Sequence, residues 1–89
     1  MEELHCTLVI PQETVFDGVV WQVSIPGNSG MFGVRAGHAP LIATVKSGVL
    51  EIARTEKERL QYTVGEAIVE VNDNRCMVVA DTALREDKS

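Results

Sequence analysis

The chain has 89 residues, of which 45% are hydrophobic and 24% charged, and its formal net charge is -5. This composition predicts one small folded domain, and the acidic balance argues against nucleic acid as a partner, because phosphate binding needs a basic surface. The sequence has no apolar run near the roughly 20 residues of a membrane-spanning helix, and its N-terminus has no secretory signal pattern. Cys6 and Cys76 lack the spacing of a metal site and are expected to be buried and reduced.

Short segments in which apolar and polar residues alternate follow one another along the chain. Alternation with period two predicts β-strands whose one face is buried. The expected strands are residues 4–10, 14–16, 19–25, 41–45, 49–54, 60–64, 67–71 and 76–80. Short strands with turn signals roughly every 8 to 12 residues are typical of an antiparallel sandwich or barrel. The sequence therefore predicts an all-β domain.

Turn residues separate these segments. Asp17 and Gly18 predict a turn after the second segment, and residues 72–75 contain Asn and Asp, which tolerate left-handed backbone geometry. Asp81 or Thr82 is placed to begin a helix as its cap, although the remaining chain is too short for a stable one. The expected organisation is a β-sandwich domain over residues 1–82 followed by a short polar tail over residues 83–89.

A segment rich in glycine and proline, residues 26–41, interrupts the alternating pattern. Glycine permits positive φ and proline fixes φ, so the segment is expected to be a shaped loop between strands. Large side chains stand on this backbone, which has little freedom to bury them locally, and irregular loops often carry function. The candidate contact residues in the segment are Met31, Phe32, Arg35 and His38.

Catalytic and cofactor chemistry finds little support in the sequence. The spacing of Gly27, Gly30 and Gly33 is not that of a nucleotide-binding motif, and no helix is expected after it to bind phosphate. The sequence predicts no catalytic residue, no metal site and no cofactor. Two alternatives stay open: a small hydrolase that uses His38 as general base, and a carrier or ligand-binding β-domain that uses Lys46 or the glycine-rich loop.

Three strand segments are apolar on both faces, namely residues 8–10, 19–20 and 77–80. A sheet with one solvated face should alternate instead. Either these are strand ends covered by loops, or another protein covers one outer face of the sheet. The out-of-phase residues that would form such a patch are Val9, Val20, Met77 and Val79.

Residues 30–41, Gly-Met-Phe-Gly-Val-Arg-Ala-Gly-His-Ala-Pro-Leu, resemble the G-x-x-G-x-x-x-G-H-A-P-L signature of the ATP synthase epsilon subunit. Further segments fit in the family's order: residues 8–11 with 15–18, then 46–50, 65–71 and 78–83. The resemblance covers about residues 4–85, nearly the whole chain. It implies a two-sheet antiparallel β-sandwich of about ten short strands that is not itself an enzyme.

In that family the domain lies at the foot of the rotor and couples ion translocation to ATP synthesis. The resemblance implies that one face binds the gamma subunit, through Val9, Val20, Met77 and Val79. It also implies that the loop contacts the c-ring of the membrane sector, through Met31, Phe32, Arg35 and His38. The chain would then lie peripherally on the cytoplasmic face of the bacterial inner membrane and reach the membrane only through the complex.

The sequence departs from the family in two respects. Met31 stands where the family often has an acidic residue, and Ala36 stands near a frequent proline. The family also usually continues into a C-terminal helical hairpin with inhibitory and, in many members, ATP-binding functions, whereas this sequence stops at Ser89. Neither function is inferred for it. The start at Met1 and the polar ending favour a naturally short subunit over a truncated one.

Overall fold

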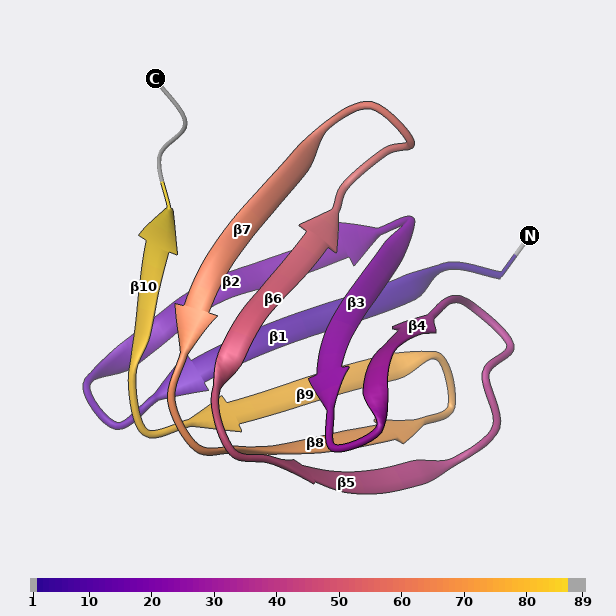
Figure 1. Cartoon of the computed structure of the whole chain (residues 1–89). Helices are drawn as coiled ribbons and strands as arrows, with labels where there is room; N and C mark the ends of the chain where they lie inside the picture. Colours follow the sequence, from indigo (N-terminus) through magenta and orange to yellow (C-terminus); the bar gives the residue numbers. More distant parts are fainter. Residues whose placement is uncertain (1, 87–89) are drawn as a thin grey trace.

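The structure, a computed structural model, describes residues 2–86, and over these residues it contains ten β-strands and no helix (Figure 1). In chain order the strands are β1 (Leu4–Ile10), β2 (Glu13–Val20), β3 (Gln22–Gly27), β4 (Gly30–Val34), β5 (Leu41–Val45), β6 (Gly48–Ala53), β7 (Arg59–Val64), β8 (Ala67–Asn72), β9 (Arg75–Ala80) and β10 (Ala83–Glu86). They form two five-stranded sheets that face each other, so the predicted β-sandwich is confirmed.

The two sheets are named here sheet A, with strand order β2-β1-β9-β8-β5, and sheet B, with order β10-β7-β6-β3-β4. Neighbouring strands pair antiparallel in both sheets, apart from β1 and β9, which are parallel with Cys6 opposite Cys76. This parallel pair joins strands near the two ends of the chain, and the pattern of a single strand does not reveal it.

The core lies between the sheets and is built from alternate residues of the strands. In β8, for example, Ala67, Val69 and Val71 are buried, while Ile68 and Glu70 are exposed. Every buried residue of the described chain is apolar or Tyr62, whose ring belongs to the same core. The period-two alternation used to predict the strands therefore reports directly which side chains fill the sandwich.

The expected turn at Asp17 and Gly18 is wrong. Strand β2 continues through both residues, with Gly18 opposite Cys6. The chain bends instead at Trp21, whose backbone N–H donates to the carbonyl of Ala53 (2.8 Å), and there it passes from sheet A to sheet B. Because the bend changes which residues face the core, Val20 is buried in sheet A and Val23 in sheet B.

Most of the glycine-rich segment is not loop but a hairpin of β3 and β4, in which Ile25 pairs with Phe32. A two-residue turn joins the strands, and a side chain at Gly27 would come within 2.9 Å of the Gly30 carbonyl oxygen. Such a contact explains why glycine is needed there. The irregular part is confined to residues 35–40, named here the β4–β5 loop.

The chain beyond Asp81 does not begin a helix over its described part. Residues 83–86 form β10, which pairs antiparallel with β7 at the edge of sheet B, so the expected polar tail begins as a strand. Backbone bonds from Gly65 N–H to Thr82 O (3.1 Å) and from Asp81 N–H to Glu66 O (2.9 Å) guide it there. An edge strand satisfies backbone groups that a helix this short leaves open. Residues 87–89 lie outside the described residues.

Three segments that are distant in sequence meet at one end of the sandwich: the N-terminal residues before β1, the β8–β9 turn and the β4–β5 loop (Figure 1). The backbone N–H of His5 donates to the carbonyl of Asn74 in that turn (2.9 Å).

In residues 2–86 no helix is long and apolar enough to cross a membrane.

Candidate functional site

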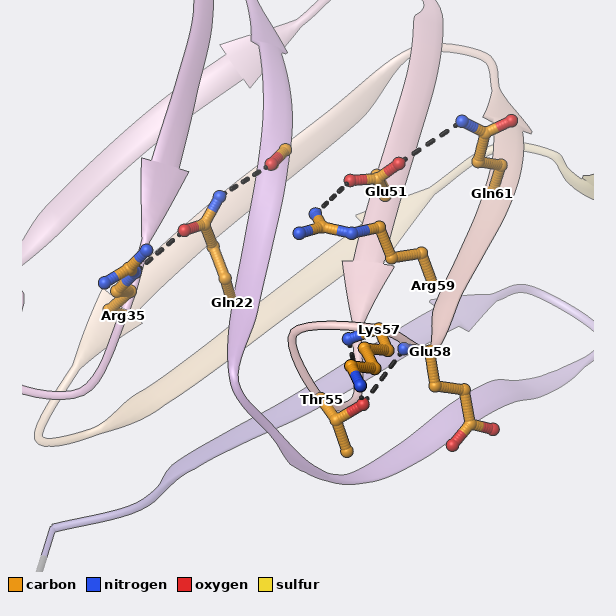
Figure 2. Close-up of polar contacts among 9 residues, drawn as sticks. Gln22, Arg35, Glu51, Thr55, Lys57, Glu58, Arg59 and Gln61 are labelled. Atoms are coloured by element: carbon orange, nitrogen blue, oxygen red, sulfur yellow. Dashed lines mark hydrogen bonds and ion pairs between the residues drawn. The ribbon is translucent and has the colours of Figure 1, made fainter.

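The β4–β5 loop is held at its start by Arg35. The Nε–H of Arg35 donates to Gln22 Oε1 on β3 (2.8 Å), and its guanidinium carbon lies 4.1 Å from the centroid of the Trp21 ring. Figure 2 shows Arg35 pointing to Gln22, which in turn donates to Ser24 Oγ (3.0 Å). A guanidinium over an indole ring is an attractive cation–π arrangement. Arg35 is thus exposed, but its charged group is engaged with the protein itself.

The middle of the loop is held by a second contact. The backbone N–H of Gly37 donates to Asn74 Oδ1 in the β8–β9 turn (2.6 Å). Gly37 has φ of 86°, a left-handed conformation that glycine adopts at little cost. The loop is therefore attached to sheet B at Arg35 and to sheet A at Gly37.

His38 follows directly and contacts the loop backbone. Its backbone N–H donates to the carbonyl oxygen of Arg35 (3.1 Å). Its ring Nδ1 lies 2.7 Å from the carbonyl oxygen of Ala39, so Nδ1 carries the ring proton and donates to that oxygen. This bond fixes the orientation of the ring, and it helps to shape the loop through its contact with the loop backbone.

Met31 and Phe32 point to opposite faces of β4. Met31 is 59% exposed on the outer face of sheet B, whereas Phe32 packs against the core. Phe32 is therefore half-buried and less open to a partner than Met31, because neighbouring residues of a strand alternate between faces. Met31, Arg35 and His38 stay at or near the surface.

The outer face of sheet B carries a network of polar side chains. Arg59 donates to Glu51 Oε1 (2.9 Å) and Gln61 donates to Glu51 Oε2 (3.3 Å), across β7 and β6 (Figure 2). The apolar side chains exposed on this face stand on separate strands, and Thr63 lies between Val49 and Leu84 in the register. This face is therefore predominantly polar.

The outer face of sheet A is different, because it carries a group of apolar side chains of which three stand side by side, while Glu70 separates Ile42 from Met77 in the register. This group, named here the apolar patch, consists of Val9, Ile42, Ile68, Met77 and Val79. In the register Val79 stands between Val9 on β1 and Ile68 on β8. Ile42 is 71% exposed, Ile68 54% and Val79 48%. Contiguous exposed apolar side chains on a sheet commonly mark a protein contact.

Comparison with the predicted patch shows one error and two omissions. Val20 is only 5% exposed and belongs to the core, because it lies on the inner face of β2 opposite the buried Leu4. Ile42 and Ile68 are absent from the predicted patch. Their signal is present in the sequence, since Ile68 occupies the polar phase of β8 beside Glu70.

A small polar cluster borders the apolar patch on β1 and β2. His5 Nε2 lies 2.6 Å from Asp17 Oδ1, and the hydroxyl of Thr7 donates to the same oxygen (3.1 Å). The hydrogen bonds from His5 and from Thr7 hold the pKa of Asp17 below its ordinary value. The carboxylate is therefore ionised at neutral pH and adds negative charge to this side of sheet A.

Lys46 lies exposed in the β5–β6 turn. It lines an open hollow of about 560 Å³ at one end of the apolar patch, together with Ile68 and Val79. Glu66 and Asp81 also line the hollow. This combination is an apolar floor with charges of both signs at the rim.

The two cysteines lie in the core as free thiols on neighbouring strands. The hydrogen bond with Cys76 and burial both raise the pKa of the Cys6 thiol. Both cysteines are buried, as expected from the sequence. Within residues 2–86, no three His, Cys, Asp or Glu side chains are grouped so that they could hold a metal ion.

Comparison with known proteins places this fold. Residues 3–86 match the family described as ATP synthase, Delta/Epsilon chain, beta-sandwich domain. The ATP synthase epsilon chain of Afipia carboxidovorans is 41% identical over 83 residues, which are 93% of this chain and 60% of that relative. The ATP synthase epsilon chain of Rhodopseudomonas palustris strain TIE-1 is 43% identical over 84 residues, which are 93% of this chain and 61% of that relative. The chain thus spans about three fifths of the length of these curated relatives.

Solved structures agree at the level of the fold. A chain in the Euglena gracilis mitochondrial ATP synthase structure (OSCP/F1/c-ring) superimposes with a TM-score of 0.88 at 24% identity, covering 96% of this chain and 54% of that one. A chain in the Tetrahymena thermophila mitochondrial ATP synthase structure (central stalk/c-ring) gives a TM-score of 0.78 at 17% identity, covering 91% and 65%. The match over residues 3–86 and the identity with epsilon chains show that this chain belongs to the β-sandwich family of the ATP synthase delta and epsilon chains.

Proposed function

We propose that the chain is a non-catalytic rotor-stalk component of a rotary F-type ATP synthase, which couples ion translocation to ATP synthesis by binding the gamma subunit and the c-ring. The observation that carries this proposal is the apolar patch on the outer face of sheet A. A family member that works by contact needs a surface for a partner, and this face offers one while sheet B is covered by polar side chains.

The apolar patch is the proposed gamma-binding surface. Val79 stands on β9, a central strand, with Val9 and Ile68 beside it, so these side chains form a surface without gaps. A partner that covers them removes apolar area from water at about 25 cal/mol per Å². The hollow beside Lys46 extends this surface and accepts one protruding apolar side chain of the partner.

The β4–β5 loop, with Met31 on the neighbouring strand, is the proposed c-ring contact. The solved structures of related fold come from complexes described as containing a c-ring, and this supports a ring-facing role for the same domain. Contacts at Arg35 and Gly37 hold the loop in place. A loop that is ordered before binding loses less conformational entropy in the complex. The proposed location is peripheral, on the cytoplasmic face of the membrane, with membrane contact only through the complex.

The gamma assignment is tested by Val79→Glu, with Val49→Glu as the matched control. The two valines are similarly exposed, at 48% and 44%, but lie on the outer faces of different sheets. We expect Val79→Glu to weaken binding of purified gamma subunit by at least about tenfold in calorimetry, because a carboxylate in a dry contact is left unpaired. Val49→Glu should bind like the original chain. Unchanged gamma affinity in a folded Val79→Glu protein would contradict the assignment.

The ring assignment is tested separately by His38→Glu. The substitution places a negative charge on the β4–β5 loop and leaves the apolar patch intact. We expect retention of the chain on immobilised c-ring in detergent to fall, while its affinity for gamma stays the same. Equal retention of the variant and the original chain would rule out this loop as the ring contact.

A further inference from the structure

We propose that Asn74 is the positioning residue of the β4–β5 loop: its side-chain amide sets where Gly37 and His38 lie relative to the rest of the sandwich. The consequence of this positioning for c-ring binding rests on the function proposed above.

Asn74 joins three segments that are far apart in sequence. Its Oδ1 accepts the N–H of Gly37 (2.6 Å), and its Nδ2 donates to Glu2 Oε2 (3.1 Å). Its backbone carbonyl accepts the N–H of His5 (2.9 Å). The loop, the N-terminal segment and the start of β1 therefore all bond to this one residue in the β8–β9 turn.

The residue type follows from two requirements that meet at this position. Asp73 and Asn74 have φ of 55° and 61°, the geometry of a tight two-residue hairpin turn that favours Asn, Asp or Gly. The side chain at position 74 must also accept from Gly37 and donate to Glu2. Gly has no side chain, and an ionised Asp only accepts. Of these three residue types, Asn alone meets both requirements.

The position of the loop depends on this bond because few other contacts hold its middle. Arg35 fixes the first residue of the loop through Gln22 and Trp21. Gly37 is exposed, and a Cβ on it would meet nothing within 4 Å, so packing does not hold it in place. The bond to Asn74 is the contact that joins this part of the loop to sheet A. Since His38 is the next residue, backbone motion at Gly37 also moves His38.

The first experiment measures solvent exchange of the Gly37 amide by NMR in Asn74→Gly. This variant keeps the left-handed turn but removes the acceptor. We expect exchange at Gly37 to become about tenfold faster, which corresponds to the loss of one ordinary hydrogen bond, while exchange of the Val78 amide in the core is unchanged. The matched control is Asp73→Gly at the neighbouring left-handed position, which leaves all three Asn74 bonds in place and should not alter Gly37.

A rescue variant tests whether the change at Gly37 comes from loss of the side-chain hydrogen bond or from an altered β8–β9 turn. The double variant Glu2→Gln with Asn74→Asp exchanges the donor and acceptor roles of the two side chains. The carboxylate introduced at position 74 accepts from Gly37, and the amide introduced at position 2 donates to that carboxylate. We expect slow exchange at Gly37 to return in this variant. Fast exchange in the rescue variant, or unchanged exchange in Asn74→Gly, would overturn the role of Asn74.

The second experiment compares the affinity of these variants for purified c-ring in detergent. We expect Asn74→Gly to lose about threefold to tenfold in affinity, as the loop must be ordered on binding, and the rescue variant to recover it. A freed Gly37 amide with unchanged c-ring affinity would uphold Asn74 as the positioning residue and overturn the ring contact of the proposed function. The failures of the two proposals are thus distinguishable.

Discussion

The guanidinium carbon of Arg35 lies 4.1 Å from the centroid of the Trp21 ring, and the Nε–H of the same side chain donates to Gln22. Arg59 approaches the same ring at 5.7 Å. Trp21 marks the bend where the chain passes from sheet A to sheet B, so this contact ties the β4–β5 loop to the point at which the chain changes sheets.

Arg35→Ala should expose the Trp21 ring and lower the free energy of unfolding by about 0.5–1 kcal/mol, the usual contribution of an exposed cation–π pair. Arg35→Lys should recover only part of this loss, since lysine has no planar guanidinium fork. Trp21 is the one tryptophan of the chain, so its fluorescence during urea unfolding reports both effects. Arg75→Ala, on β9 of sheet A, serves as the control and should leave the emission maximum unchanged.

Val20 and Val79 should respond very differently to the same substitution. Val20→Glu places a carboxylate in the core and should destabilise the fold by about 3 kcal/mol or more. Val79→Glu should cost less than about 1 kcal/mol, because the side chain is 48% exposed on a sheet face. Thermal or urea unfolding of the isolated chain distinguishes them. Equal destabilisation by the two substitutions would contradict the inward placement of Val20.

Stability at low pH should depend on Asp17. Hydrogen bonds from His5 and Thr7 lower its pKa in the folded chain below the ordinary 3.8. A depressed carboxyl pKa means that the folded state favours the ionised form. The resulting stabilisation is fully present above pH 3.8 and is lost as the pH falls through the lower folded value. Asp17→Asn should flatten the pH dependence of unfolding in this acidic range and leave the remaining carboxylates to set it. An unaltered acid profile in Asp17→Asn would contradict the pairing.

Cys6 and Cys76 should be unreactive toward a thiol reagent in the folded chain. Both side chains are buried, so the reagent does not reach either thiol in the folded chain. In Cys6 the hydrogen bond with Cys76 together with burial also raises the pKa, so its nucleophilic thiolate is scarce. We expect neither thiol to react with Ellman's reagent until urea unfolds the protein, and both to react together then. An added surface thiol, Thr63→Cys, should react at once and confirms that the reagent is active. Rapid labelling of the native thiols would show that the core opens more readily than the structure implies.

The alternation of apolar and polar residues by itself determined most of the strands and the residues that fill the core. Strand β8 shows why: its side chains point alternately to the two faces, so Val69 and Val71 are identified as buried without knowledge of any neighbour. The same pattern failed at Trp21, because a strand that leaves one sheet for another changes the face that it buries. The local pattern cannot show that change, and this is why it misplaces Val20.

For the same physical reason, the sequence predicted the candidate site only in part. The glycine-rich segment pointed to Met31, Arg35 and His38, and apolar residues in the wrong phase pointed to Val9, Met77 and Val79. Pairing between strands that are distant in sequence decided the rest. It placed Val9 beside Val79 in a parallel register, and it brought Asn74 to Gly37 across 37 residues of chain. Alternation in the sequence shows that a strand has two different faces. Only the tertiary structure decides which other strands and turns lie beside that strand.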